Sequence, residues 1–195
     1  GLNLAAIWNL PIVFVITNNM YGMGTSVEMA SAEPELFRRA AAYRMPAERV
    51  DGQDVLAVRE ATQRLMRLAR DERQPALLEC MTYRYRGHSV ADPGKSYRPA
   101  EEIEAWKLRD PVLLFEHTLR ERGVIDDTHV AEVRASVEAE VQDAIDYALK
   151  SPDPDPRDLY KHVYGDAAQD EFARMAIGAP FGEASIDARP WDDPA

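Results

Sequence analysis

The chain has 195 residues, and 34 acidic against 23 basic side chains give it a formal net charge of −11. An acidic surface repels nucleic acid and anionic membrane surfaces, so we expect neither as a partner. No apolar stretch is long enough to cross a bilayer, and residues near Gly1 do not resemble a targeting peptide. The single cysteine, Cys80, excludes a disulfide within the chain and favours a buried thiol in a reducing compartment.

The first helix predicted from the sequence covers residues 1–9 and is ended by Leu10-Pro11, because the residue before a proline disfavours helical backbone. An uninterrupted apolar run follows at residues 12–16. A run without polar alternation is typical of a central strand of a parallel sheet that is covered on both faces. Such sheets bind ligands at the carboxyl ends of their strands, which here is the polar segment of residues 17–26.

Asn18 and Asn19 open that polar segment. An asparagine oxygen and a free loop carbonyl are neutral oxygen donors of the kind that Mg²⁺ accepts beside phosphate oxygens. Gly22 and Gly24 are expected to reach positive φ and to leave room for a cofactor against the main chain. Ordinary β-turns use the same residue types, so this segment alone leaves both interpretations open.

The next elements alternate as in an α/β domain. We expect a helix from residues 31–34 to about 43, a short strand that ends at Arg49-Val50, and a helix capped by Asp54. The apolar stripe of that last helix should pack on the sheet. Strands near residues 12, 50 and 77 with helices between them predict a parallel sheet with flanking helices.

A second apolar run at residues 75–83 is followed by a polar loop at residues 84–98. The loop is the most basic short stretch of the chain and would suit an anion such as diphosphate; its basic residues are Arg84, Arg86, Lys95 and Arg98. His88 is its only histidine and could donate to a phosphate oxygen or exchange a proton near neutral pH. A solvated surface loop is the alternative.

Together the two segments resemble the alpha subunit of thiamine-diphosphate-dependent 2-oxo acid dehydrogenases, specifically the decarboxylating component of pyruvate dehydrogenase. The resemblance covers residues 1 to about 164. The motifs that carry the resemblance are Tyr-Gly-Met-Gly-Thr-Ser at 21–26, Arg-Tyr-x-Gly-His-Ser at 84–89 and Asp-Pro-Gly-x-Ser-Tyr-Arg at 92–98. The diphosphate motif of the family opens with Gly-Asp-Gly, and only its closing asparagine pair is present. We therefore expect an N-terminally truncated chain that is inactive alone.

The resemblance implies the site residues. Asn19 would bind Mg²⁺ and touch the cofactor through its side-chain oxygen, and Tyr21 would offer its backbone carbonyl to the same ion. His88 would contact the cofactor and help to pass the acyl group to a lipoyl arm. The aspartate that serves the family as third metal ligand is missing. Serines that eukaryotic members phosphorylate correspond to Ser26, Ser89 and Ser96, which we expect to be structural here.

The function implied by the resemblance is decarboxylation of pyruvate, a small 2-oxo acid, with thiamine diphosphate and Mg²⁺ as cofactors and transfer of the acetyl group to the lipoyl arm of the acyltransferase. A beta subunit would complete an α2β2 heterotetramer. We expect a cytoplasmic bacterial protein, or a mitochondrial matrix protein if the source is eukaryotic. An acetoin or branched-chain 2-oxo acid dehydrogenase is the near alternative, and a non-catalytic assembly piece is the alternative of another class.

The expected domains are residues 1–99, the C-terminal part of the cofactor-binding α/β domain; 100–164, a helical extension; and 165–195, a mobile tail. Helices should run from Asp110-Pro111 to Gly123 and from residues 126–127 to about 150. The apolar stripe of the longer helix is expected in the core, with docking on a partner subunit as the alternative. Its members are Val130, Val133, Val137, Val141, Ile145 and Ala148.

Beyond the long helix, residues 151–156 predict an extended connector, 158–164 the closing segment of the family, and 169–175 a short helix. The remaining histidines have no Cys or His at metal-ligand spacing, so we expect them at the surface; they are His117, His129 and His162. The tryptophans carry no motif.

Overall fold

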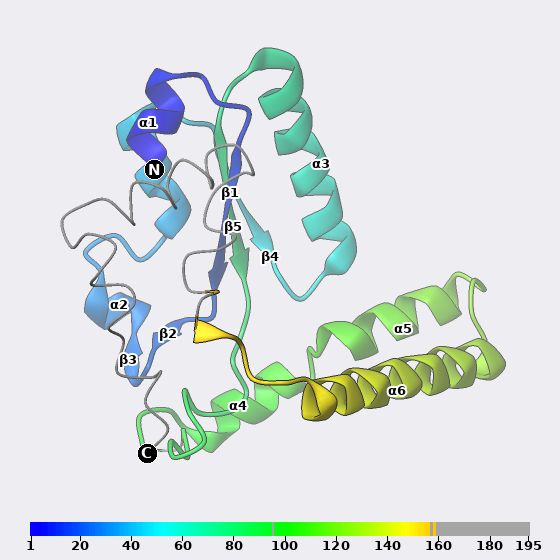
Figure 1. The fold of residues 1–195 in the computed structure, drawn as a ribbon. Coiled ribbons are helices and arrows are strands. Elements are labelled where there is room, and N and C mark those ends of the chain that lie inside the picture. The colour runs from blue at the N-terminus through cyan, green and yellow to red at the C-terminus, as the bar shows by residue number, and fades with distance from the viewer. Residues whose placement is uncertain (95, 157, 159–195) are drawn as a thin grey trace, which may run out of the picture. The chain divides into compact units, whose positions relative to one another are not determined.

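The computed structural model describes residues 1–94, 96–156 and 158. One compact unit spans Gly1–Glu132, and a second begins at Val133. The first unit holds a three-stranded parallel sheet with helices on both faces (Figure 1), which confirms the predicted α/β class. Among the described residues, no helix combines the length and the apolar character that a membrane span requires.

The sheet has the strand order β1-β5-β4, with β1 at Val13–Asn18, β4 at Ala47–Asp51 and β5 at Ala76–Met81. The first five residues of β5 are buried, so β5 is the central strand. The expectation that the 12–16 run is the central strand is wrong: in the described chain β1 pairs with β5 alone, and Val15 is 57% exposed. An apolar run shows that a strand prefers burial, but it does not show how many neighbours the strand has.

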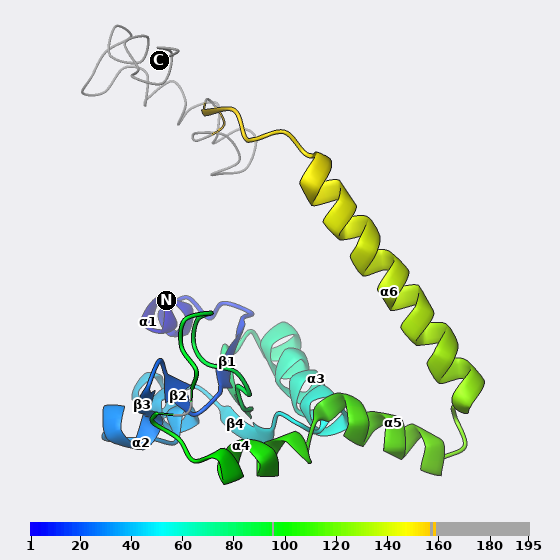
Figure 2. The same cartoon turned by 90° about the horizontal axis from the view of Figure 1, so that it is seen from below.

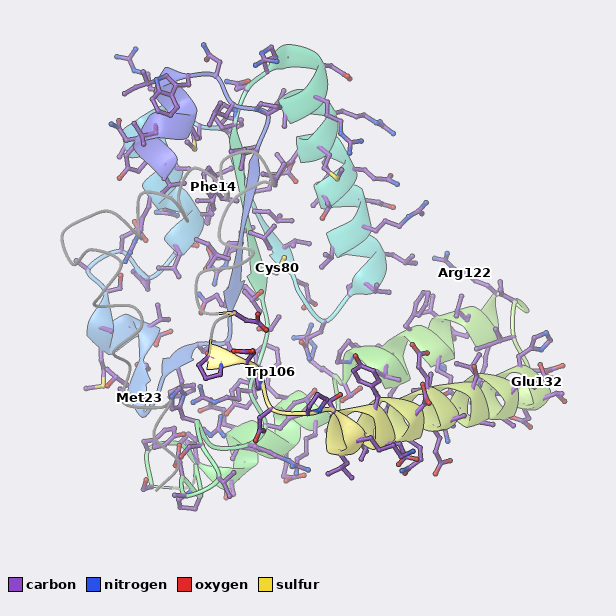
Figure 3. All side chains as sticks on the ribbon, viewed as in Figure 1. Phe14, Met23, Cys80, Trp106, Arg122 and Glu132 are labelled. Carbon is purple, nitrogen blue, oxygen red and sulfur yellow. The ribbon has the colours of Figure 1, made fainter. Side chains whose placement is uncertain are left out.

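Helices cover the two faces with alternate residues of β5. On one face α3, Val55–Glu72, packs on Ala76, Leu78 and Cys80. On the other face α1, Leu2–Ile7, and the 3₁₀ helix η1, Leu36–Tyr43, pack around Leu77. Figure 3 shows Phe14 and Cys80 on opposite sides of the sheet. This double covering follows from the strand period of two, since successive side chains point to opposite faces.

The predicted helix caps are present. Asp54 accepts hydrogen bonds from the backbone N–H groups of Leu56 and Ala57, and Asp110 accepts one from Val112. The segment after Pro34 is helical as expected, but it takes the 3₁₀ form and begins at Leu36.

Short elements gather at the carboxyl edge of the sheet. Strands β2, Tyr21–Gly22, and β3, Thr25–Ser26, form an antiparallel hairpin, and α2 follows at Val27–Ala30. Helices α4, Ala100–Lys107, and α5, Pro111–Glu121, come after the second polar loop. Figure 2 views the molecule from this edge, with β2, β3 and α4 around the ends of the strands.

Helix α6 spans Asp127–Lys150 and runs from the first unit into the second. It ends where the proline-rich connector begins, as predicted. None of its residues is buried, and the stripe residues Val133 and Val137 are 62% and 53% exposed. The core expectation for this stripe is therefore wrong, because the helical period identifies an apolar face without specifying what covers it. Docking on a partner subunit stays a prediction.

The remaining C-terminal expectations divide between confirmed and untested. The side chains of His117 and His129 are 70% and 60% exposed, which confirms two of the three surface histidines. His162, the tail and, apart from Asp158, the closing segment lie outside the described residues. The domain boundaries at 99 and 164 stay predictions.

Candidate functional site at the carboxyl edge of the sheet

Two polar loops leave the sheet at the same edge. Strands β1 and β5 run parallel, and their last residues, Asn18 and Met81, are paired. The Arg84 guanidinium donates a 2.9 Å hydrogen bond to the backbone oxygen of Met23, and the rings of Tyr21 and Tyr97 lie 5.8 Å apart. The structure thus joins the Asn19–Tyr21 turn to the loop that carries His88.

The turn after β1 is built from two asparagine side chains. Asn18 Oδ1 accepts the backbone N–H of Met20 at 2.9 Å, and Asn19 Oδ1 accepts that of Tyr21 at 3.2 Å. A carboxamide oxygen has two acceptor lone pairs, so one N–H bond leaves Asn19 Oδ1 the capacity to bind a cation. The turn holds the predicted metal ligands, the Asn19 side chain and the Tyr21 backbone, two residues apart.

The glycines of this turn act differently from expectation. The positive φ angles belong to Met20, at 69°, and Met23, at 54°, and not to Gly22 or Gly24. Gly24 is needed for close approach instead, since a Cβ there would lie 3.1 Å from Tyr97 Cδ1. At Gly22 a Cβ would meet nothing within 4 Å, so this side of the turn is open.

The basic loop does not offer all its charges to an anion. Arg98 is only 3% exposed, and its guanidinium donates to four backbone oxygens of its own loop, those of Arg84, Tyr85, Arg86 and Gly94. It also lies 5.2–5.7 Å from three tyrosine ring centroids. The hydrogen bonds of Arg98 therefore organise the loop, and its expected attraction of a diphosphate stays a prediction. Lys95 lies outside the described residues.

Asp92 closes the loop around His88. Its carboxylate accepts the backbone N–H of His88 at 2.7 Å, that of Gly94 at 2.7 Å and the Tyr97 hydroxyl at 2.8 Å. These donors, with the His88 amide as the strongest cause, lower the pKa of Asp92. The His88 side chain itself is exposed. The loop therefore fixes the backbone of His88 and leaves the imidazole accessible.

Helix α4 ties both loops together through tyrosines. Glu102 accepts the hydroxyl of Tyr21 at 3.0 Å and that of Tyr83 at 2.8 Å, and the Trp106 ring stacks on Tyr83 at 5.2 Å. Burial, followed by the Glu102 hydrogen bond, raises the pKa of Tyr83 to about 12 and raises that of Tyr21 as well. Both phenols remain protonated donors at neutral pH, so these contacts persist.

In the described ranges, no three His, Cys, Asp or Glu residues come together in a way that could hold a metal ion. Cys80 is buried as expected, and burial raises the pKa of its thiol, which keeps the reactive thiolate scarce.

Sequence reasoning missed the structural roles of Glu79 and Asp92 at this edge, and it named Arg98 only as a charge suited to an anion. Glu79 is fully buried in the central strand. A signal for it was present, since a charged residue inside an otherwise apolar strand must find polar partners. For Arg98 and Asp92 no local signal separates a structural charge from a ligand-binding one.

The dehydrogenase E1 component family model matches residues 1–157. Among the relatives, the human mitochondrial pyruvate dehydrogenase E1 component subunit alpha, testis-specific form, is 42% identical over 84% of this chain. The somatic form from Sus scrofa is 41% identical over 83% of the chain, and the subunit alpha from Porphyra purpurea is 35% identical over 85%.

This chain covers 42% of the human relative, 41% of the pig relative and 48% of the algal relative, so it spans less than half of their length. The match to the family model extends over most of the residues that the structure describes, including both polar loops. The chain therefore belongs to the dehydrogenase E1 component family.

Proposed function

We propose that the chain is part of the alpha subunit of a thiamine-diphosphate-dependent enzyme that decarboxylates pyruvate and transfers the acetyl group to the lipoyl arm of an acyltransferase. One observation carries the proposal: a turn with two neutral oxygen donors and a loop with an accessible histidine are bonded together at the carboxyl edge of a parallel sheet. The names of the relatives support pyruvate as the substrate.

The residues present fit the diphosphate end of such a cofactor. Asn19 Oδ1 and the Tyr21 carbonyl are hard oxygen donors suited to Mg²⁺, whose remaining ligands would include phosphate oxygens. The open side of Gly22 gives space against the main chain. When bound, thiamine diphosphate supplies the electron sink for loss of CO₂ from a 2-oxo acid.

The residues of this chain would then have three tasks. Asn19 and Tyr21 would hold the cation, and His88 would donate to a phosphate oxygen or move a proton near the reacting centre. The tyrosines bonded to Glu102 keep the two loops in one arrangement. A beta subunit in an α2β2 assembly would complete the site. The human and pig relatives are named mitochondrial, which supports a matrix location if the source is eukaryotic.

The metal role is tested by Asn19→Ala in the assembled enzyme. Loss of a ligand oxygen should weaken Mg²⁺-dependent binding of thiamine diphosphate about tenfold or more, measured by calorimetry. Cofactor affinity equal to wild type would remove Asn19 from the site.

The histidine role is tested by His88→Ala, with His117→Ala as the matched control because both imidazoles are exposed. Loss of one proton-transfer group should lower acetyl transfer to lipoamide about 100-fold while thermal stability stays unchanged. The control should behave as wild type.

The substrate is tested by parallel assays with pyruvate, acetoin and 3-methyl-2-oxobutanoate on the enzyme co-expressed with its beta subunit. Preference for acetoin or 3-methyl-2-oxobutanoate would overturn pyruvate as the substrate.

A further inference from the structure

The buried carboxylate of Glu79 is hydrogen-bonded to Asn18, the first residue of the turn Asn18–Tyr21 that carries the proposed metal ligands (the metal turn). Glu79 sits in the central strand β5 with 0% of its surface exposed, on the face opposite Ala76, Leu78 and Cys80. A buried charge is costly unless hydrogen bonds compensate it. A leucine would fill the same interior without that cost, so the partners of Glu79 reveal what the carboxylate does.

Both carboxylate oxygens are used. Oε1 accepts Asn18 Nδ2 at 2.7 Å, and Oε2 accepts the backbone N–H of Phe37 at 2.9 Å. The Arg49 guanidinium contributes opposite charge, with its Nε 3.9 Å from Oε2. Glu79 therefore joins the end of β1 to the first turn of η1, two elements that no short stretch of sequence connects.

The bond to Asn18 fixes which way that side chain faces. With Nδ2 held by Glu79, Asn18 Oδ1 must point toward the turn, where it accepts the N–H of Met20. Met20 has a φ of 69°, a conformation that a residue with a side chain rarely adopts. The backbone oxygen of Asn18 accepts the N–H of Thr82 at 2.8 Å, which fixes the base of the same turn to β5.

We infer that Glu79 and Asn18 are positioning residues for the metal turn: the buried carboxylate orients the Asn18 amide, and that amide holds the strained turn that presents Asn19 and Tyr21. This inference rests on the proposed function. It concerns residues that touch neither metal nor cofactor, and it predicts that metal affinity depends on a hydrogen bond inside the sheet.

The hydrogen-bond directions supply a rescue experiment. In Glu79→Gln, one of the two donors, Asn18 Nδ2 or the Phe37 N–H, faces an amide NH₂ group. In the wild type, Asn18 Nδ2 donates to Glu79 Oε1 at 2.7 Å. In Asn18→Asp, a carboxylate oxygen replaces that donor and faces the Glu79 carboxylate. In the double variant N18D/E79Q, the new amide at position 79 would donate to the new carboxylate at position 18 and accept from Phe37. Both bonds are then restored, the first with its direction reversed, and the net charge is that of the wild type.

The readout is Mg²⁺ binding to the assembled enzyme with saturating thiamine diphosphate and no substrate, measured by calorimetry. Each single variant should raise the Mg²⁺ dissociation constant about tenfold, and the double variant should return most of that loss. Leu77→Ala is the control, because Leu77 is buried in the same strand and on the same face as Glu79, but its side chain makes none of the hydrogen bonds that link Glu79 to Asn18 and Phe37. It should reduce thermal stability and leave Mg²⁺ affinity unchanged.

A second measurement needs no metal. In enzyme freed of cofactor, amide hydrogen exchange at Met20 should be faster in each single variant and slow again in the double variant. If Glu79→Gln does not assemble, Asn18→Ala supplies the same comparison because it removes both links.

Single variants with wild-type Mg²⁺ affinity, or a double variant no better than the singles, would overturn the positioning role. Asn19→Ala separates this from failure of the proposed function. If Asn19→Ala weakens Mg²⁺ binding and Glu79→Gln does not, only the inference is lost. If neither does, the proposed metal site is lost as well.

Discussion

The two loops of the candidate site are held by different parts of the molecule. The turn with Asn19 is fixed from inside the sheet, through Asn18 and the buried Glu79. The loop with His88 is fixed mainly by residues of its own sequence neighbourhood, above all Arg98 and Asp92. Damage to the first loop should therefore reach the protein core, whereas damage to the second should stay local. Substitutions in each loop test that difference.

The largest effect is expected for Gly87→Ala. An added Cβ would lie 1.9 Å from the backbone oxygen of Asp92, a contact that forces the loop to move. Displacing His88 by about 1 Å should lower acetyl transfer about 100-fold. Because the loop is outside the sheet, Mg²⁺ affinity should stay near wild type. Equal loss of Mg²⁺ binding would show that the contacts between the loops, Arg84 to Met23 and Tyr97 to Tyr21, carry the displacement to Asn19.

The next effect is expected for Arg98→Lys. A lysine ammonium cannot reproduce the planar set of bonds to four backbone oxygens, so buried carbonyls lose their donors. We expect loss of about 2 kcal/mol of unfolding free energy and about tenfold lower acetyl transfer. Arg86→Lys, at an exposed arginine of the same loop, is the control. An unchanged unfolding free energy in Arg98→Lys would contradict the organising role.

A smaller effect is expected for Gly22→Ala, which probes the open side of the metal turn. The added methyl group meets no atom of the chain within 4 Å, so thermal stability should not change. If a cofactor packs there, its binding should weaken by about 1 kcal/mol, or about fivefold. Calorimetry of cofactor binding gives the answer, and wild-type affinity would place the cofactor elsewhere.

The smallest effect is the pH dependence of the His88 loop. Asp92 has a pKa below its ordinary value of 3.8, so the order it gives the loop is complete above that value and is lost as pH falls through the lowered pKa. Exchange protection of the His88 and Gly94 amides, relative to β5, should be constant from about pH 5 to 8. Asp92→Asn should lack this protection at every pH. Loss of protection in the wild type between about pH 5 and 7 would show that a group other than Asp92 governs the order of the loop.

Much of the fold follows from local patterns. The caps at Asp54 and Asp110 and the end of α6 were predictable, because an acceptor before a helix or a proline acts within a few residues. The apolar runs placed the strands but not their ends, since β1 continues to Asn18 and β5 stops at Met81. The proposed position of the site follows from the same local reasoning, because polar loops follow both strands at one edge of the sheet.

The sequence by itself thus determined the class of fold and the family, and it indicated the edge at which we propose that a ligand binds. Only the tertiary structure decided that β5 and not β1 is central, that Arg98 turns inward, and that Glu79 meets Asn18 across 61 positions of sequence. Each of these features depends on which segment, distant in the sequence, packs against the residue or strand in question. A residue type shows that a charge or an apolar face needs a partner, but folding selects the partner.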